Sequence, residues 1–221
     1  MLQNNRFFAL TTGFSLILMA VAAGVAYGYG FQQLYVPGDA GATWSQLISR
    51  PELYNSLVGG FGVTLILDFV VAWSLYRYFQ SRYPTLSVYM AALRLLYALF
   101  LAVAVWYLIQ LGGIRSGAPD PDGAMGAIAA FNKAWSLGLI VFGAHLLLLG
   151  VLVVRAPESP SALGYLAAFA GLCYAGIHSA AALWPGFKQY QASVEAALGL
   201  PMALGELLLA FWFIFKYYKC E

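Results

Sequence analysis

Six long apolar stretches, separated by short polar connections, make up nearly the whole chain. Each is longer than the roughly 20 mostly apolar residues that a membrane-crossing helix needs. None of them alternates apolar and polar residues with a period of two, so a transmembrane β-barrel is excluded. The pattern predicts an all-α membrane protein, a single domain over residues 1–221 with a bundle of six transmembrane helices at about 7–30, 54–79, 85–112, 126–154, 161–184 and 194–217.

Residues 31–53, the longest connection, contain the signals of one further short helix. Residues 36–39 are typical of a turn, and Asp39 at its end suits the N-cap of a helix. The apolar residues that follow fall on one face of that helix, with Trp44 at the depth of the lipid headgroups. We expect a short periplasmic interfacial helix between the first two transmembrane helices, and we expect Asp122 to cap the fourth.

The composition agrees with this class, because 62% of the 221 residues are apolar and only 9% are charged. Soluble proteins are roughly a quarter charged, so a cytosolic globular enzyme and a disordered chain are both excluded. The net charge of +2 is too small to indicate a polyanionic partner. The predicted partner is therefore the lipid bilayer, and no nucleic acid is expected.

The positively charged residues are distributed unevenly between the two sides of the predicted membrane. Cytoplasmic loops carry an excess of lysine and arginine, and this bias sets the orientation of the helices. One side of this chain has Arg6, Arg77, Arg82, Arg155, Lys216 and Lys219, whereas the other has Arg50, Arg115 and Lys188. The bias predicts that both termini are cytoplasmic.

Five ionisable residues lie well inside the predicted helices: Asp68, Arg94, His145, His178 and Glu206. Such residues are costly in hydrocarbon, and they are a functional-site hypothesis by default. At about 1.5 Å of rise per residue, Asp68, Arg94, His145 and Glu206 lie about 14–18 Å from the cytoplasmic edge. The fifth helix adds Tyr174 at this depth, with His178 one turn further outward. We take these six residues as candidates for a ligand or proton site.

The charges in this layer do not balance. Arg94 stays protonated, so Asp68 and Glu206 cannot both ionise cheaply beside it. Either one acid holds a proton or His145 becomes an imidazolium. A structural interpretation is also open, because a buried Asp68–Arg94 bridge between adjacent helices could simply fix their register.

A metal site is the most specific chemical alternative, since two histidines and two carboxylates could hold zinc or iron. Two observations count against it. His145 and His178 differ in depth by about 10 Å on the helical rise, and Arg94 disfavours a cation beside it. We therefore assign no metal ligand and no cofactor.

Glycine and proline predict where helices approach closely or bend. Gly24 and Gly28 form a small-xxx-small pair in the first helix, and residues 59–62 of the second are rich in glycine. Both patterns favour close helix contact. Pro201 removes one backbone hydrogen bond from the sixth helix, which is expected to kink there.

Three stretches resemble a bacterial family of six-helix membrane proteins that is catalogued only as a domain of unknown function. They are the loop at 36–43, residues 142–150 of the fourth helix, and residues 204–207 followed by Trp212. The resemblance implies a multi-pass protein of a bacterial inner (cytoplasmic) membrane and implies no reaction. It marks Asp39, His145 and Glu206 as family-type positions, although Asp39 is explained by its role as a helix cap.

Three functions remain compatible with the sequence. The first is binding or transport of a small or lipid-like ligand at the polar layer, linked to proton movement. The second is an integral membrane enzyme acting on a lipid-type substrate, with His145 as acid or base and Glu206 or Asp68 as its partner. The third is a non-catalytic accessory or scaffold subunit held by its buried ion pair. We favour the first and assign no catalytic residue, ligand or oligomeric state.

Overall fold

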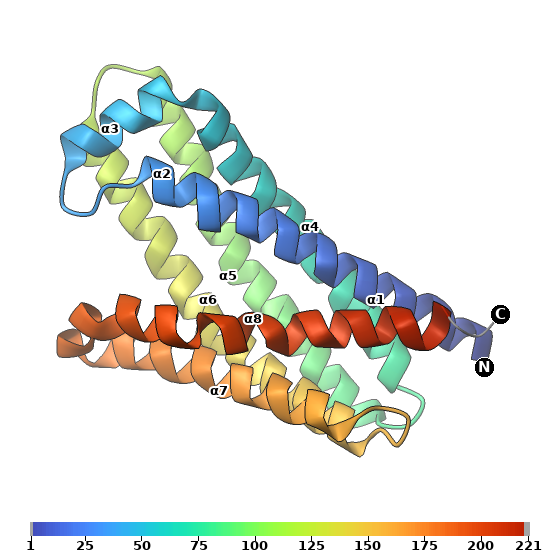
Figure 1. Ribbon diagram of the computed structural model, residues 1–221. Helices are drawn as coiled ribbons and strands as arrows, with labels where there is room; N and C mark the ends of the chain where they lie inside the picture. The colour runs from blue at the N-terminus through green and yellow to red at the C-terminus, as the bar shows by residue number, and fades with distance from the viewer. Residues whose placement is uncertain (1, 219–221) are drawn as a thin grey trace. The chain divides into compact units, whose positions relative to one another are not determined.

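The computed structural model describes the backbone of residues 2–218 and the side chains of residues 5–217, and all regular structure in this part of the chain is helical (Figure 1). Lys219, which was counted for the orientation, lies outside the described residues. The long helices are α1 (Leu2–Ala23), α4 (Pro51–Phe79), α5 (Pro84–Ser116), α6 (Pro121–Arg155), α7 (Ser161–Leu183) and α8 (Lys188–Tyr218). The short ones are the π-helix η1 (Gly24–Phe31), α2 (Gln32–Leu34), α3 (Ala40–Ser49) and the 3-10 helix η2 (Pro185–Phe187).

Six helical stretches of the described chain are long and apolar enough to cross a membrane. They are Asn5–Leu34, Pro51–Phe79, Pro84–Ser116, Pro121–Arg155, Ser161–Leu183 and Pro185–Tyr217. The predicted fold class is confirmed, and α3 is the predicted short helix between the first two spans. The first and last spans are longer than predicted, because η1 and α2 extend α1 and because η2 leads directly into α8.

Prolines mark where several of these helices begin. Pro51, Pro84 and Pro121 occupy the first position of α4, α5 and α6. This position suits proline because its missing N–H has no partner inside the helix in any case.

Two aspartates supply caps at helix N-termini. Asp39 Oδ1 accepts a hydrogen bond from the backbone N–H of Ala42 at 2.8 Å, so the predicted cap of α3 is confirmed. For α6 the prediction was wrong: Asp120, and not Asp122, accepts the bond from the N–H of Gly123, at 2.9 Å. Since Pro121 takes the first helical position, the cap must be the residue before it.

The chain divides into two compact units. Unit 1 consists of residues 2–17, 68–98 and 136–218, and unit 2 of residues 18–67 and 99–135. The helices α1, α4, α5 and α6 contribute one part to each unit, whereas α7 and α8 belong to unit 1 alone. Whether the chain is a single domain stays a prediction.

In unit 1, α6 and α7 touch backbone to backbone at two pairs of glycines. A Cβ added to Gly143 would lie 2.6 Å from the carbonyl oxygen of Gly171, and one added to Gly150 would lie 2.5 Å from that of Gly164. Both separations are shorter than any side chain tolerates. The glycines stand seven residues apart on each helix, so both pairs face the same neighbour. This contact fixes α6, and with it His145, against α7.

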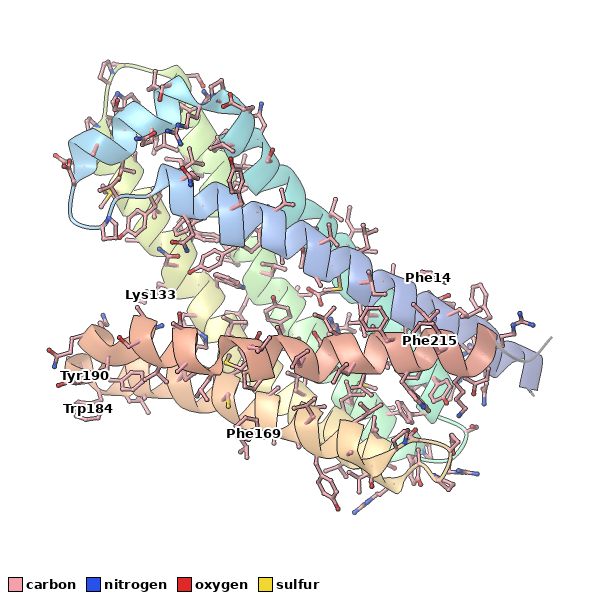
Figure 2. The ribbon with its side chains drawn as sticks, viewed as in Figure 1. Phe14, Lys133, Phe169, Trp184, Tyr190 and Phe215 are labelled. Carbon is pink, nitrogen blue, oxygen red and sulfur yellow. The ribbon has the colours of Figure 1, made fainter. Side chains whose placement is uncertain are left out.

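The α7 and α8 helices of unit 1 lie side by side (Figure 1). A Cβ on Gly205 of α8 would come within 2.8 Å of the Ala170 side chain on α7, so this contact is also close. Large apolar side chains such as Phe169 and Phe215 are exposed on these two helices (Figure 2). An exposed apolar surface is what the lipid-facing side of a membrane helix requires.

Unit 2 has an aromatic interior. The fully buried ring of Phe131 contacts Phe31, Phe61 and Trp135, with ring centroids 5.2–5.8 Å apart. Tyr27 of the π-helix packs edge-on against Trp135 at 4.5 Å. Such aromatic arrangements add about 0.5–1.5 kcal/mol per pair beyond the buried area.

Most of the glycines that the sequence named for close helix contact do not make one. At Gly24 and Gly28 an added Cβ would meet no described atom within 4 Å, and the same holds for Gly59 and Gly62. Only Gly60 of that group is in close contact, because its Cβ would lie 2.7 Å from the side chain of Ala26. Four of the five glycines named for this role therefore do not mediate helix packing in the structure.

Candidate functional site

Four helices of unit 1 bring Asp68, Arg94, His145 and Glu206 together around one guanidinium group. Arg94 Nε donates to Asp68 Oδ1 at 2.9 Å, and Arg94 Nη1 donates to Glu206 Oε1 at 2.8 Å. The same Nη1 lies 3.1 Å from His145 Nε2. We call these four residues the Arg94 cluster. Its members come from α4, α5, α6 and α8, as their similar depth in the sequence suggested.

The hydrogen bonds of His145 determine its charge. A guanidinium group can only donate, so His145 Nε2 must accept from Arg94 and carries no proton. The proton is then on Nδ1, which donates to the backbone carbonyl of Met90 at 2.9 Å. His145 is therefore neutral, and of the two charge states left open by the sequence, the imidazolium is excluded by this geometry. With both ring nitrogens engaged, His145 has none left for acid–base chemistry.

The members of the cluster differ in how accessible they are. The side chains of Arg94 and Asp68 are 0% exposed, whereas that of Glu206 is 21% exposed. Glu206 follows Gly205 in α8 and stands one turn beyond Pro201, which interrupts the backbone hydrogen bonds of the helix. Glu206 is therefore the partly exposed acid of the cluster.

One oxygen of the cluster has no partner. Asp68 Oδ2 is buried and receives no hydrogen bond from any described residue. Since His145 is neutral, one cation faces two carboxyl groups, and the fully ionised cluster would carry one excess negative charge. An uncompensated charge of this kind is expensive away from water. One bound proton is enough to neutralise the cluster.

Tyr174 and His178 lie outside the Arg94 cluster. The Phe142 ring stands between them and Arg94: it packs edge-on against Tyr174 at 5.3 Å, and the Arg94 guanidinium carbon lies 5.5 Å from its centroid. The ring of His178 is parallel to that of Tyr174, and His178 Nδ1 is 2.9 Å from Ser136 Oγ. The six candidates thus form a group of four and a neighbouring pair.

The described residues form no metal-ligating group, and the open groove lies away from the six candidates. Among the residues that the structure describes, no three His, Cys, Asp or Glu side chains are placed to share a metal ion. An open groove of about 620 Å³ lies in unit 2 between α5 and α6, lined by residues such as Trp106, Gln110 and Gly126, and by none of the six candidates. The groove is therefore separate from the Arg94 cluster.

Comparison with known proteins identifies the family. Residues 11–216 match the family described as a domain of unknown function, DUF4386. The chain belongs to the DUF4386 family. The resemblance seen in the loop and in the fourth and sixth helices is thereby confirmed, although the family assigns no reaction to this DUF4386 chain. No curated protein and no solved structure matches it significantly.

Three groups that complete the site were not foreseen from the sequence. The Met90 carbonyl and Ser136 Oγ orient the two histidines, and Phe142 separates their surroundings. Phe142 precedes His145 by three residues and so shares its helix face, which the helical period could have indicated. The other two partners depend on how α5 and α7 pack on α6, and the sequence carries no signal for that.

Proposed function

We propose that this DUF4386 protein binds, and moves through the membrane, a small or lipid-like ligand that carries an anionic group. Arg94 is its binding residue, and Glu206 is the exchangeable counter-ion that occupies the site at rest. One observation carries the proposal: Arg94 Nη1 is bound at 2.8 Å by Glu206, the partly exposed acid of the cluster, while the rest of the cluster is buried.

The chemistry of exchange follows from this arrangement. Asp68 and His145 hold the guanidinium in place from the buried side. A sulfonate, phosphate or carboxylate group can replace the Glu206 carboxylate, because arginine binds all of these oxyanions. Pro201 removes one backbone hydrogen bond of α8 and so makes the part of the helix before Glu206 easier to bend.

The exchange is linked to a proton. In this proposal the proton that balances the resting cluster sits on the orphaned Asp68 Oδ2, and Glu206 is ionised against Arg94. A displaced Glu206 carboxylate left in an apolar environment is costly, so it takes up a proton as the ligand arrives. A monovalent anion and one proton therefore enter together, and the site stays neutral.

The main rival is a scaffold role, in which the Arg94 cluster only clamps four helices. The closure of Arg94 on both acids favours this alternative as well, because buried ion pairs can fix the register of helices. A clamp, however, gives no reason for one of its acids to be exposed or for a proline near it. An enzyme using His145 as acid or base finds no support, since both of its ring nitrogens are engaged.

We place the protein in the inner (cytoplasmic) membrane of a bacterium with both termini cytoplasmic. The uneven distribution of lysine and arginine supports the orientation. The bacterial membrane rests on the family resemblance.

Thermal stability of the detergent-purified protein tests the binding claim. The probes share a decyl chain and differ in headgroup: decanesulfonate, decyltrimethylammonium and decyl maltoside. Methanesulfonate tests for a small ligand in place of a lipid-like one. Because a bound ligand stabilises the folded state, we expect the melting temperature to rise with decanesulfonate and not with the cationic or neutral probe.

Two variants of α8 provide the matched comparison. Glu206→Gln weakens the competing internal counter-ion and should increase the stabilisation by decanesulfonate. Glu195→Gln removes an acid of the same helix whose hydrogen bond comes from Gln191 and not from Arg94, and its binding response should be that of the wild type. Equal changes in melting temperature with all three headgroups in the wild type would favour a purely structural role of the Arg94 cluster over anion binding.

A further inference from the structure

Unit 1 contains the second histidine of the chain, His178, in surroundings unlike those of His145. It is 6% exposed, and its Nδ1 lies 2.9 Å from Ser136 Oγ. Its Nε2 has no hydrogen-bond partner among the described residues. Since both nitrogens of His145 are engaged, His178 is the histidine that is able to accept and release a proton.

Tyr174 connects His178 with the acids of α8. It stands one turn before His178 on α7, and the two rings are nearly parallel, at 11°, with centroids 6.4 Å apart. Tyr174 packs against the apolar cluster that includes Met202 of α8, which brings its hydroxyl within electrostatic range of Glu206 and Glu195. A series of polar groups therefore runs from Ser136 through His178 and Tyr174 to Glu206.

The series leads to Glu206 and not directly to Arg94. Phe142 covers Arg94 on the side that faces Tyr174, with 5.3 Å between the two rings. At the other end of the series, α7 ends at Leu183, near the exposed rings of Trp184 and Tyr190 (Figure 2). His178 is closer to the Leu183 end of α7 than to the Ser161 end, so the membrane surface at the Leu183 end is the nearer one.

We propose that His178 is the proton carrier of Glu206 and that the Tyr174 hydroxyl is the bridge between them. His178 Nε2 takes a proton from water at the Leu183 end of α7. The protonated ring gives it to the Tyr174 oxygen as that hydroxyl releases its own proton to the Glu206 carboxylate, so His178 returns to neutral and Glu206 becomes the acid. Water molecules bridge the separation between these groups. The inference rests on the proposed function, which supplies the step in which Glu206 needs a proton.

The groups around the relay are compatible with this direction of transfer. The negative charges of Glu195 and Glu206 on α8 act on Tyr174, and both favour the arrival of a proton at that end. On α6, Ser136 does not titrate and orients the ring of His178 through Nδ1, which leaves Nε2 available. The Phe142 ring contacts both the Arg94 guanidinium and Tyr174 and so separates this cation from the relay.

Rapid mixing of the protein in lipid nanodiscs with decanesulfonate tests the relay. A pH-indicator dye in weak buffer reports proton uptake, and the sulfonate carries no proton of its own at neutral pH. The amplitude measures whether Glu206 is protonated, and the rate measures how the proton arrives. In His178→Ala and in Tyr174→Phe the amplitude should stay the same while the rate falls at least about tenfold, as for the loss of a proton-transfer group.

The controls separate a relay from a structural role. Tyr165→Phe removes a hydroxyl from an exposed tyrosine of the same helix and should not change the rate. Imidazole added to His178→Ala should restore the rate, which it cannot do for a variant that is merely distorted. If His178→Ala does not fold, His178→Gln retains a hydrogen-bonding partner for Ser136 and carries the same test.

The two proposals fail in different ways. Normal amplitude with an unchanged rate in both His178→Ala and Tyr174→Phe would overturn the relay and leave the proposed function standing. Absence of proton uptake in the wild type would overturn both. The proposed function predicts that proton uptake is lost in Glu206→Gln. The relay adds that uptake is slow in His178→Ala and in Tyr174→Phe.

Discussion

The two units fill their interiors with different chemistry. Among the described residues, the buried ionisable side chains Asp68, Arg94, His145 and His178 all belong to unit 1. The buried polar side chains of unit 2 are Thr43 and Thr64, and its centre is formed by aromatic rings around Phe131. Both kinds of interior can hold helices together, but only the interior of unit 1 contains buried acidic and basic side chains.

The difference is informative because lipid changes what each interior contributes. Lipid tails are as apolar as leucine, so the aromatic contacts of unit 2 gain packing and no transfer out of water. The charges of unit 1 lose solvation when they are buried, and their mutual attraction has to offset that loss. A membrane protein can pack its helices without such a cluster, as unit 2 does, which is why we look for function in unit 1.

The largest effect is expected from Arg94→Gln. It leaves Asp68 and Glu206 without their cation, which should cost about 3–5 kcal/mol, the usual range for one partner removed from a buried pair. Arg115→Gln is the matched control in unit 2, because Arg115 is half-buried and stacks on the Tyr54 ring at 5.0 Å. Its loss should cost no more than about 1 kcal/mol. Equilibrium unfolding in mixed micelles measures both, and equal costs would remove the distinction between the units.

The next largest effect should come from the glycine contact of unit 1. A side chain at Gly143 would collide with the backbone of Gly171 and Ala175, each 2.6 Å from the added Cβ. Gly143→Val should therefore cost about 3 kcal/mol, the upper end of the usual range for overpacking. Gly176→Val on α7 meets no described atom within 4 Å and should stay within about 1 kcal/mol of the wild type. Similar melting temperatures for the two variants would contradict the close contact.

Truncation of the aromatic centre of unit 2 is expected to have a smaller effect. Phe131→Ala should cost about 1–2 kcal/mol, less than the 3–5 kcal/mol typical of a water-soluble core, because only the packing contribution is lost. The response to decanesulfonate should not change, since no member of the Arg94 cluster belongs to unit 2. A loss of that response in Phe131→Ala would show that the aromatic centre takes part in the site.

The smallest effect is expected from Asp68→Asn. If Asp68 Oδ2 carries the resting proton, asparagine is nearly isosteric with the protonated acid and still accepts from Arg94 Nε. The free energy of unfolding should then change by less than about 1 kcal/mol. A cost of about 3–5 kcal/mol would indicate that Asp68 is ionised at rest and that the neutralising proton lies elsewhere.

The predictions made from the sequence were most reliable where they depended on the geometry of a single helix. Length and hydropathy determine six spans, and the depth count placed Asp68, Arg94, His145 and Glu206 in one layer, because the helical rise is fixed. Asp39 was recognised as a cap from its neighbours in the chain. Each of these inferences needs only local geometry.

The predictions made from the sequence were least reliable where they depended on how two helices pack against each other. Gly24 and Gly28 have the spacing of a contact motif, yet neither lies at a close contact, whereas Gly143 and Gly171 on other helices do. A small residue permits close approach and does not select the partner. For the same reason the depth count could not show that Phe142 separates Tyr174 and His178 from Arg94.

The most direct test of the proposed exchange is the infrared absorption of protonated carboxyl groups before and after decanesulfonate is added. We predict that the anion produces a new protonated-carboxyl band in the wild type and in Glu195→Gln. We predict no such band in Glu206→Gln, because buried Asp68 already holds its proton at rest and the carboxyl that takes up a second proton is missing. Decanesulfonate binding without a new band in the wild type, or a new band that persists in Glu206→Gln, would contradict the role of Glu206 as the exchangeable, proton-accepting counter-ion of Arg94.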